Sequence, residues 1–408
     1  MKNKFYIATV ILILVSVRIC VAQTAYITNI YSTVSSVSVI DVVTNTLVDT
    51  IPVGVTPVGV TVSADGSRVY TANSNSNTVS VISTATNTVL ATIHVGDGPQ
   101  GVVVNSDGSK LYVAVSWENT VLVINTATNA IIDTIAVGNH PYNVCITPDD
   151  SKVYVSNNGD NSVSVINTTT NSVSALIGVG IQPYGLAVTP DGSKVYVSNV
   201  YSQSVSVIST ITNSIITTIM VGEYPLGICA SPDGNRIYVT SGYDNAVYII
   251  KASTNAIVDT IPVGYYPYGI SVTPDGSKVY VTDYAINQVS VIDAATKTVS
   301  ATLTGFYGPI SMGNFISSCT HSAGVNSYDS ELENVFIYPN STSGQFTITL
   351  PANDAKIKIT DLLGKEIKTI NIRGKQCVID KGEMEAGIYF VSIEDENKNE
   401  VNRKIVIE

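Results

Sequence analysis

The fold is decided by a stretch that reads PYGLAVTPDGSKVYVSN from Pro183 to Asn199. Two runs rich in β-branched and aromatic residues flank Pro190-Asp-Gly-Ser193, a sequence typical of a tight turn. The pattern recurs every 42 residues, and an internal period of this length indicates a repeat architecture. The repeat prolines are Pro57, Pro99, Pro141, Pro183, Pro225, Pro267 and Pro309.

Each repeat contains four strand signals, which we call A, B, C and D. In the repeat that begins at Pro183 they cover residues 185–189, 194–198, 205–209 and 214–221. Turn signals separate them, and no segment shows the 3.6-residue apolar period of a helix. Four antiparallel strands in 40–45 residues are typical of one propeller blade. We therefore predict an all-β, seven-bladed β-propeller with four-stranded blades.

The two ends of the repeat region complement each other. The chain starts with strands B, C and D, at about 25–53, and ends with a lone strand A at 310–316. Pairing these ends would complete the seventh blade and remove the open sheet edges. A linear β-solenoid is the alternative, but it would not need complementary partial repeats.

The repeat resembles a known family. Tyr154-Val-Ser-Asn157 and Tyr196-Val-Ser-Asn199, with their Thr-Pro-Asp-Gly turns, resemble the YVTN-type β-propeller repeat over roughly residues 24–316. Mild departures are Tyr112-Val-Ala-Val115, Tyr238-Val-Thr-Ser241 and Tyr280-Val-Thr-Asp283. The resemblance implies a fold and an exported location, but no single chemistry.

Residues 1–22 are interpreted as a secretory signal peptide. Two lysines precede the apolar run 5–17, and Cys20-Val-Ala22 resembles a cleavage site. A lipid anchor on Cys20 is the alternative, although Arg18 fits it poorly. The apolar run is too short to span a bilayer, so we expect no transmembrane helix in the mature chain.

Composition excludes two further classes. Only 13% of residues are charged and 45% are hydrophobic, unlike a disordered chain. The formal net charge of −11 argues against nucleic-acid binding. Cys145 and Cys229 occupy the same register position two repeats apart, so we expect small buried apolar side chains rather than a disulfide.

The predicted disc has two unlike faces. The A–B and C–D turns, on what we call the turn face, are nearly identical in every repeat and need only close turns. The D–A and B–C loops, on the loop face, vary and are rich in tyrosine, so we expect them to bind a glycan or a protein. Tyrosines that merely cap neighbouring blades are the alternative reading. The expected ligand-binding residues are Trp117, His140, Tyr142, Tyr184, Tyr201, Glu223, Tyr224, Tyr243, Tyr265, Tyr266, Tyr268 and Tyr284.

Carboxylates are expected on the same loops. They would favour cationic partners or a weak Ca²⁺ site, although no Ca²⁺ motif is present, so no cofactor or metal site is predicted. The six are Asp97, Glu118, Asp160, Glu223, Asp244 and Asp283.

Catalytic motifs are missing from the sequence. It has no Gly-x-Ser-x-Gly, His-Glu-x-x-His, Gly-Lys-Thr or Cys-x-x-Cys motif. An enzyme of lactonase or lyase type would use His140 at the mouth of the tunnel, with Glu223 and Asp97. We predict no catalytic residue and keep that enzyme as an alternative.

A linker at 317–331 precedes a C-terminal domain at 332–408. Seven short strands are expected there, at 335–338, 345–350, 356–360, 366–372, 376–379, 388–394 and 403–407, and they suggest a small immunoglobulin-like β-sandwich. A sandwich module that binds a ligand is the alternative to the resemblance described next.

The C-terminal domain resembles the type A sorting domain of the type IX secretion system. The residues that carry the resemblance are Ile337-Tyr-Pro-Asn340, Gly344-Gln-Phe346, Ile359-Thr-Asp361, Gly364-Lys365, Gly387-Ile-Tyr389 and the terminal sorting signal Lys404, Ile405, Val406, Ile407 and Glu408. Ser341 departs from the usual proline. The resemblance implies contact with the secretion machinery, secretion across the outer membrane and attachment of the passenger to the cell surface.

The sequence therefore predicts an exported cell-surface binding or adhesion propeller. An extracellular lactonase- or lyase-like propeller and a self-assembling coat component remain alternatives.

Overall fold

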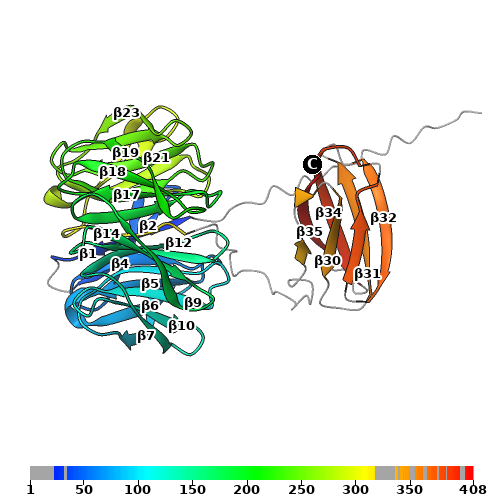
Figure 1. Ribbon diagram of the computed structural model, residues 1–408, viewed down its shortest axis with the longest axis horizontal. Helices are drawn as coiled ribbons and strands as arrows, with labels where there is room; N and C mark the ends of the chain where they lie inside the picture. The colour runs from blue at the N-terminus through cyan, green and yellow to red at the C-terminus, as the bar shows by residue number, and fades with distance from the viewer. Residues whose placement is uncertain are drawn as a thin grey trace, which may run out of the picture. The chain divides into compact units, whose positions relative to one another are not determined.

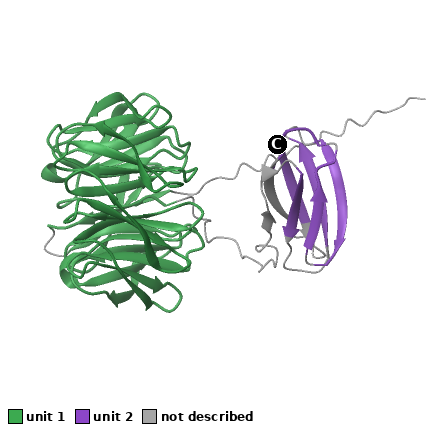
Figure 2. Ribbon diagram, viewed as in Figure 1, with its two compact units in different colours: residues 1–322 green, residues 323–408 purple. Residues whose placement is uncertain are grey.

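The computed structural model describes residues 23–31 and 35–317 of the first unit. In the second it describes 336–338, 341–342, 344–349, 354–361, 365–374, 376–382, 384–395 and 400–407. The predicted signal peptide, residues 318–331 of the predicted linker and Glu408 lie outside the described residues. The chain forms two compact units, residues 1–322 and 323–408 (Figure 2).

The first unit is built from sheets of antiparallel strands, as the repeat predicts (Figure 1). Six sheets have four strands each, in the order A-B-C-D along the chain, and β1-β2-β3 form a seventh sheet with three.

The strands fall into the four predicted classes. Strands A are β4 (Pro57–Val62), β8 (Pro99–Val104), β12 (Pro141–Ile146), β16 (Pro183–Val188), β20 (Pro225–Ala230) and β24 (Pro267–Val272). Strands B are β1 (Thr24–Asn29), β5 (Arg68–Asn73), β9 (Lys110–Val115), β13 (Lys152–Asn157), β17 (Lys194–Asn199), β21 (Arg236–Ser241) and β25 (Lys278–Asp283). Strands C are β2 (Ser36–Asp41), β6 (Thr78–Ser83), β10 (Thr120–Asn125), β14 (Ser162–Asn167), β18 (Ser204–Ser209), β22 (Ala246–Lys251) and β26 (Gln288–Asp293). Strands D are β3 (Thr46–Pro52), β7 (Thr88–His94), β11 (Ala130–Ala136), β15 (Ser172–Gly178), β19 (Ser214–Met220), β23 (Ala256–Pro262) and β27 (Thr298–Leu303).

Burial follows the position of each strand in its blade. Strands A, B and C are largely buried, whereas the D strands are mostly exposed. Apolar side chains of neighbouring blades pack together, so the core is divided among the blade interfaces. Each strand B contributes one fully buried tyrosine to this core. They are Tyr26, Tyr70, Tyr112, Tyr154, Tyr196, Tyr238 and Tyr280.

The ends of the disc close on each other, as the offset repeats predict. The backbone of 309–316 bridges antiparallel to β1, at Ala25–Ile316 and Asn29–Pro309. The N–H of Tyr26 donates to the carbonyl of Phe315 at 2.8 Å. The same segment contacts β4 on its other side, where the N–H of Val60 donates to the carbonyl of Met312. Residues 309–316 thus act as the missing strand A of the first blade.

The second unit is a β-sandwich. One sheet has the order β28-β30-β33 and the other β29-β35-β34-β31-β32. Apolar residues of both sheets share one core, which includes Phe346, Ile348, Ile357 and Val391. The strands are β28 (Phe336–Tyr338), β29 (Ser341–Thr342), β30 (Gln345–Thr349), β31 (Asp354–Asp361), β32 (Glu366–Arg373), β33 (Gln376–Asp380), β34 (Gly387–Asp395) and β35 (Glu400–Ile407).

The sandwich differs from the prediction by one strand. The short β29 was not predicted, and it pairs parallel to β35 at Ser341–Val406. The described part of the predicted sorting signal, Lys404 to Ile407, lies on β35 between β29 and β34. Ile405 and Ile407 are buried in the core, so the signal is part of the folded sheet.

The described residues contain very little helix. They are two single turns of 3-10 helix, η1 (Ser74–Ser76) and η2 (Tyr284–Ile286). Neither is long enough to cross a membrane.

Candidate functional site: a tyrosine-lined cavity on the loop face

The D–A loops are positioned by asparagines of the B–C loops. In five repeats, the side-chain carbonyl of an asparagine accepts a hydrogen bond from the residue immediately before a repeat proline. These pairs are Gly98–Asn77, His140–Asn119, Gln182–Asn161, Tyr266–Asn245 and Gly308–Asn287, at 2.6–3.1 Å. The backbone of both loop sets is therefore fixed by the repeat, while the side chains on it vary.

The residue before the repeat proline adopts a left-handed backbone conformation. Gly98 and Gly308 do this without strain, but His140, Tyr224 and Tyr266 have φ of 50°, 62° and 54°. A bulky residue in this region costs on the order of 1 kcal/mol or more, and such strain gathers at functional sites. The loop face thus holds tyrosines where the backbone favours glycine.

These loops and the first residues of the A strands enclose a cavity of about 530 Å³. The volume lies in the range of small-molecule sites. One group of lining residues is aromatic and consists of Tyr142, Tyr184, Tyr224, Tyr266, Tyr268 and Tyr284. A second group supplies amides and hydroxyls and consists of Thr56, Ser74, Gln100, Asn158 and Gln182. Apolar residues complete the lining. They are Ile30, Val58, Val200, Leu226, Ala285 and Ile310.

The tyrosines form a continuous set of ring contacts. Tyr142 packs on Tyr184 with centroids 4.2 Å apart, and Tyr184 contacts Tyr268 edge-on. Tyr284 links Tyr268 to Tyr266, and Tyr266 contacts Tyr224. Each such pair is worth about 0.5–1.5 kcal/mol beyond its buried area, so the rings hold one another in place.

The phenol groups of the set are neutral hydrogen-bonding groups. The hydroxyl of Tyr184 bonds to those of Tyr142, at 2.8 Å, and Tyr268. Burial raises the pKa of Tyr142, Tyr224, Tyr266 and Tyr268 above the ordinary value of 10. None of the lining residues therefore carries a formal charge at neutral pH.

The other predicted ligand-binding residues lie outside this lining. Tyr201 and Tyr243 extend it, because their rings contact Tyr224 at 5.9 and 4.7 Å. Trp117 and His140 form a separate exposed pair with centroids 4.9 Å apart. Tyr265 and Glu223 are also exposed.

Three of the expected loop-face carboxylates stabilise neighbouring loops through hydrogen bonds. Glu118, Asp160 and Asp244 accept hydrogen bonds from the backbone N–H groups of Asp97, Asn139 and Glu223. Within the described residues, no three histidine, cysteine or carboxylate side chains gather as metal ligands would. The hypothetical trio of His140, Glu223 and Asp97 is not brought together in the cavity, since none of them lines it.

Asp283 was predicted wrongly as a loop-face carboxylate. It is the last residue of β25, and its side chain is fully buried. It occupies the register position of Asn157 and Asn199, whose amides donate to two serines of the next strand. Asp283 instead accepts a hydrogen bond from Ser290 at 2.6 Å, and burial raises its pKa to about 6.

The amide and hydroxyl residues of the cavity were not among the predicted site residues. An alignment of the repeats could have identified two of them. Gln100 is equivalent to Tyr142, Tyr184 and Tyr268, and Gln182 is equivalent to Tyr224 and Tyr266. The prediction selected loop residues by their aromatic or charged side chains and did not use their equivalent positions in the repeat.

The turn face has a repeated structural role. Basic side chains after the A–B turns donate to backbone carbonyls of the next blade's C–D turn, as Lys194 does to Ala252 at 2.8 Å. The buried tyrosine of strand B joins them, since the hydroxyl of Tyr196 donates to Asn255 at 2.7 Å. Lys278 and Tyr280 make the same bonds to Val42 and Asn45 across the closure of the disc.

Comparisons with known proteins agree with this architecture. Residues 336–408 match the family of secretion system C-terminal sorting domains, and residues 103–191 and 150–241 match the YNCE-like β-propeller family. The chain therefore combines a YNCE-like β-propeller region with a type IX secretion sorting domain. The sorting domain indicates a secreted protein of the outer cell surface.

Solved structures share the propeller fold. Hydrazine synthase of Kuenenia stuttgartiensis aligns with a TM-score of 0.59 at 20% identity, over 66% of this chain and 96% of that chain. A functionally unknown protein from Desulfotomaculum acetoxidans aligns with a TM-score of 0.63 at 15% identity, over 72% and 99%. At these identities the likeness extends to the fold alone.

A curated relative is similar over a short stretch. An endo-acting ulvan lyase of Formosa agariphila is 33% identical over 75 residues, which are 18% of this chain and 14% of that protein. The chain thus spans about one seventh of this relative's length.

Proposed function

We propose that this chain is an exported, surface-displayed binding protein whose loop-face cavity holds an uncharged glycan. The observation that supports this is the composition of the cavity, which combines tyrosine rings with amides and hydroxyls and has no charged side chain. Sugar rings present C–H faces that pack on aromatic rings, and their hydroxyls need donors and acceptors at fixed positions.

The negative charge of the chain and of its loop face favours an uncharged ligand over an acidic one. The chain carries a net charge of −11, and Glu118, Asp160 and Asp244 stand on the loops of the same face. Like charges at a binding face slow the approach of an anionic polymer and weaken its binding. Sulfated or uronic-acid polysaccharides should therefore bind less well than neutral ones.

The binding test uses the full chain on an array of neutral and acidic oligosaccharides, followed by calorimetric titration of the best neutral binder. The double variant Tyr224→Gly/Tyr266→Gly should lose at least tenfold in affinity, on the order of 1.4 kcal/mol or more. It removes two rings at positions where other repeats have glycine. Trp117→Ala, outside the cavity, is the matched control and should bind normally.

Other outcomes identify other functions. Loss of binding in Trp117→Ala alone would move the site to the Trp117–His140 pair. A preference for acidic glycans would contradict the charge argument. Concentration-dependent self-assembly with no glycan bound would favour a coat component.

The export route is also a proposal. We infer that residues 1–22 are removed as a signal peptide and that the C-terminal domain contacts the secretion machinery and leads to surface attachment. Mass spectrometry of the exported protein should find an N-terminus near Gln23. Deletion of 332–408 should leave the propeller behind the outer membrane.

A further inference from the structure

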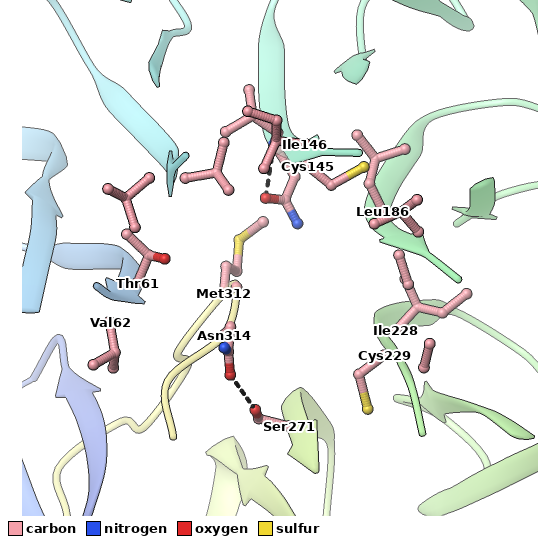
Figure 3. Close-up of a pocket in the computed structure, with 18 of the residues that line it drawn as sticks. Thr61, Val62, Cys145, Ile146, Leu186, Ile228, Cys229, Ser271, Met312 and Asn314 are labelled. Carbon is pink, nitrogen blue, oxygen red and sulfur yellow. Dashed lines mark hydrogen bonds between the residues drawn. The ribbon is translucent and has the colours of Figure 1, made fainter. Parts of the chain in front are cut away.

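A second cavity, of about 630 Å³, is lined by residues of the strands A and of the A–B turns, so it lies toward the turn face. Figure 3 shows side chains of its lining. Pro148, Pro190, Pro232 and Pro274 of the A–B turns belong to its lining. Its walls are mainly aliphatic and include Val62, Ile146, Leu186, Ile228 and Met312. We call it the turn-face cavity.

The two cavities are separated by packed side chains. Tyr184 lines both of them, and it packs in one cluster with Val58, Leu226, Ile310 and Met312. Apart from Tyr184, the two linings have no described residue in common, so the two sites can be tested separately.

Asn143 breaks the repeat inside the turn-face cavity. The third residue of strand A is Gly59, Gly101, Gly185, Gly227 or Gly269 in five other repeats, and Ser311 in the closing segment. A Cβ at Gly227 or Gly269 would lie 2.3 or 2.1 Å from a carbonyl oxygen of the next blade. The packing of the disc thus favours glycine at this position, and the fold itself gives no reason for an asparagine.

The amide of Asn143 has an unused donor. The residue is only 5% exposed, and its Oδ1 accepts a hydrogen bond from the N–H of Val144 at 2.8 Å. Among the described residues, its Nδ2 has no hydrogen-bond partner. The Nδ2 is accessible from the cavity that Asn143 lines, so an acceptor oxygen of a bound molecule can take a hydrogen bond from it, worth about 0.5–1.5 kcal/mol.

Asn314 is a second departure in the same cavity. The equivalent residues of the other repeats are Val62, Val104, Ile146, Val188, Ala230 and Val272. The Oδ1 of Asn314 accepts a hydrogen bond from Ser271 at 3.1 Å (Figure 3). Two amides therefore replace a glycine and an aliphatic residue, and both line one apolar cavity.

We propose that the turn-face cavity binds an uncharged, largely apolar small molecule through an oxygen that accepts a hydrogen bond from Asn143. The aliphatic walls exclude a charged ligand, because no ionic partner is provided inside them. The only carboxylate of the described lining, Asp150, belongs to the A–B turn and accepts hydrogen bonds from Ser106. The thiols of Cys145 and Cys229 are neutral apolar wall groups, since burial raises the pKa of Cys145 to about 12 and that of Cys229 further.

The test uses two uncharged fluorescent dyes on the full chain. Nile red carries a carbonyl oxygen, whereas diphenylhexatriene is a hydrocarbon without an acceptor. Asn143→Gly restores the residue of the repeat and should weaken Nile red binding about tenfold, the value of one neutral hydrogen bond, while diphenylhexatriene binds as before. Asn314→Trp places a large ring in the cavity and should abolish binding of both dyes.

Two controls make the result decisive. Thermal unfolding confirms that each variant is folded, and Tyr224→Gly/Tyr266→Gly on the loop face should leave dye binding unchanged. Dye binding that persists in Asn314→Trp would place the dyes outside the turn-face cavity and overturn the site. Equal weakening of both dyes by Asn143→Gly would overturn the role of the amide.

Discussion

On the turn face the same side-chain bonds recur from blade to blade, whereas on the loop face the same backbone carries a different side chain in each repeat. Lys194 and Tyr196 on the turn face have counterparts in Lys278 and Tyr280, which make the same bonds. On the loop face, one position holds His140, Gln182 or Tyr266 over the same asparagine anchor. The comparison shows that repeated residues hold the disc together, while the side chains that line the loop-face cavity come from positions that vary between repeats.

The largest expected effect comes from opening the closure of the disc. Phe315 is fully buried in a cluster that joins the closing segment to the first blade. Phe315→Ala should destabilise the chain by about 3–5 kcal/mol through lost burial and a cavity. Chemical denaturation measures this loss. Trp117→Ala, at a side chain that is 69% exposed, should change stability by less than about 0.5 kcal/mol. Similar losses in both variants would contradict the difference between the core and the loop face.

Asp283 tests what happens when a repeated buried position is filled with an ionisable group. Its pKa is raised to about 6, so the folded state holds the proton more tightly than the unfolded state. The carboxyl therefore costs nothing below about pH 4. It lowers stability as the pH rises toward 6, and above that the cost levels off at about 3 kcal/mol at most.

Asp283→Asn restores the residue of the repeat. It should stabilise the chain by about 1–3 kcal/mol at pH 8, and the gain should vanish near pH 4. Urea denaturation at both pH values measures the difference. A gain that is independent of pH would show that ionisation is not its cause.

The closure joint should behave like any other blade interface. Tyr280→Phe removes a hydroxyl that bonds to Asn45 across the closure, and Tyr196→Phe removes its counterpart inside the disc. Each substitution should cost about 1 kcal/mol, the net value of one hydrogen bond. Thermal unfolding of the two variants side by side checks this. A much larger cost for Tyr280→Phe would mean that the closure is the weaker joint.

The smallest change in stability is expected at a strained position of the loop face. Tyr224→Gly places glycine at a left-handed position where Gly98 and Gly308 already stand. Relief of backbone strain, on the order of 1 kcal/mol, offsets much of the lost ring contacts, so stability should fall by about 1 kcal/mol or less. Calorimetric unfolding measures stability, and the glycan titration described above measures function. A clear loss of stability would mean that the tyrosine serves the fold rather than the site.

Much of the fold can be predicted from the sequence because the same pattern of strands and turns recurs in every repeat. The strands, the turns and the closure by 310–316 are all predicted from register. Asp283 was misassigned because it lies at the boundary between β25 and the following loop. The sequence does not show whether this residue ends the strand or begins the loop, and the structure places it in the strand.

The expected residues include only part of the lining of the candidate site, for a different reason. The six tyrosines of the loop-face cavity lie among the expected residues, but Gln100, Gln182 and Asn158 do not, because the prediction selected aromatic, histidine and carboxylate side chains. The turn-face cavity was not anticipated at all. Its two amides are visible only when each repeat is compared with the others at one position, and the space around them depends on how the strands A approach one another.

The closing segment also determines how the disc would respond to a pulling force. Residues 309–316 are held between β1 and β4, and the chain beyond Ser317 leads to the sorting domain. If that domain fixes the protein to a surface, any drag on a bound ligand is transmitted through this one strand. The backbone hydrogen bonds nearest the linker, from Ser317 to Thr24 and from Tyr26 to Phe315, then become the first to carry the tension. Stretching single molecules between the two units should extract residues 309–316 as the first mechanical event, before any blade unravels.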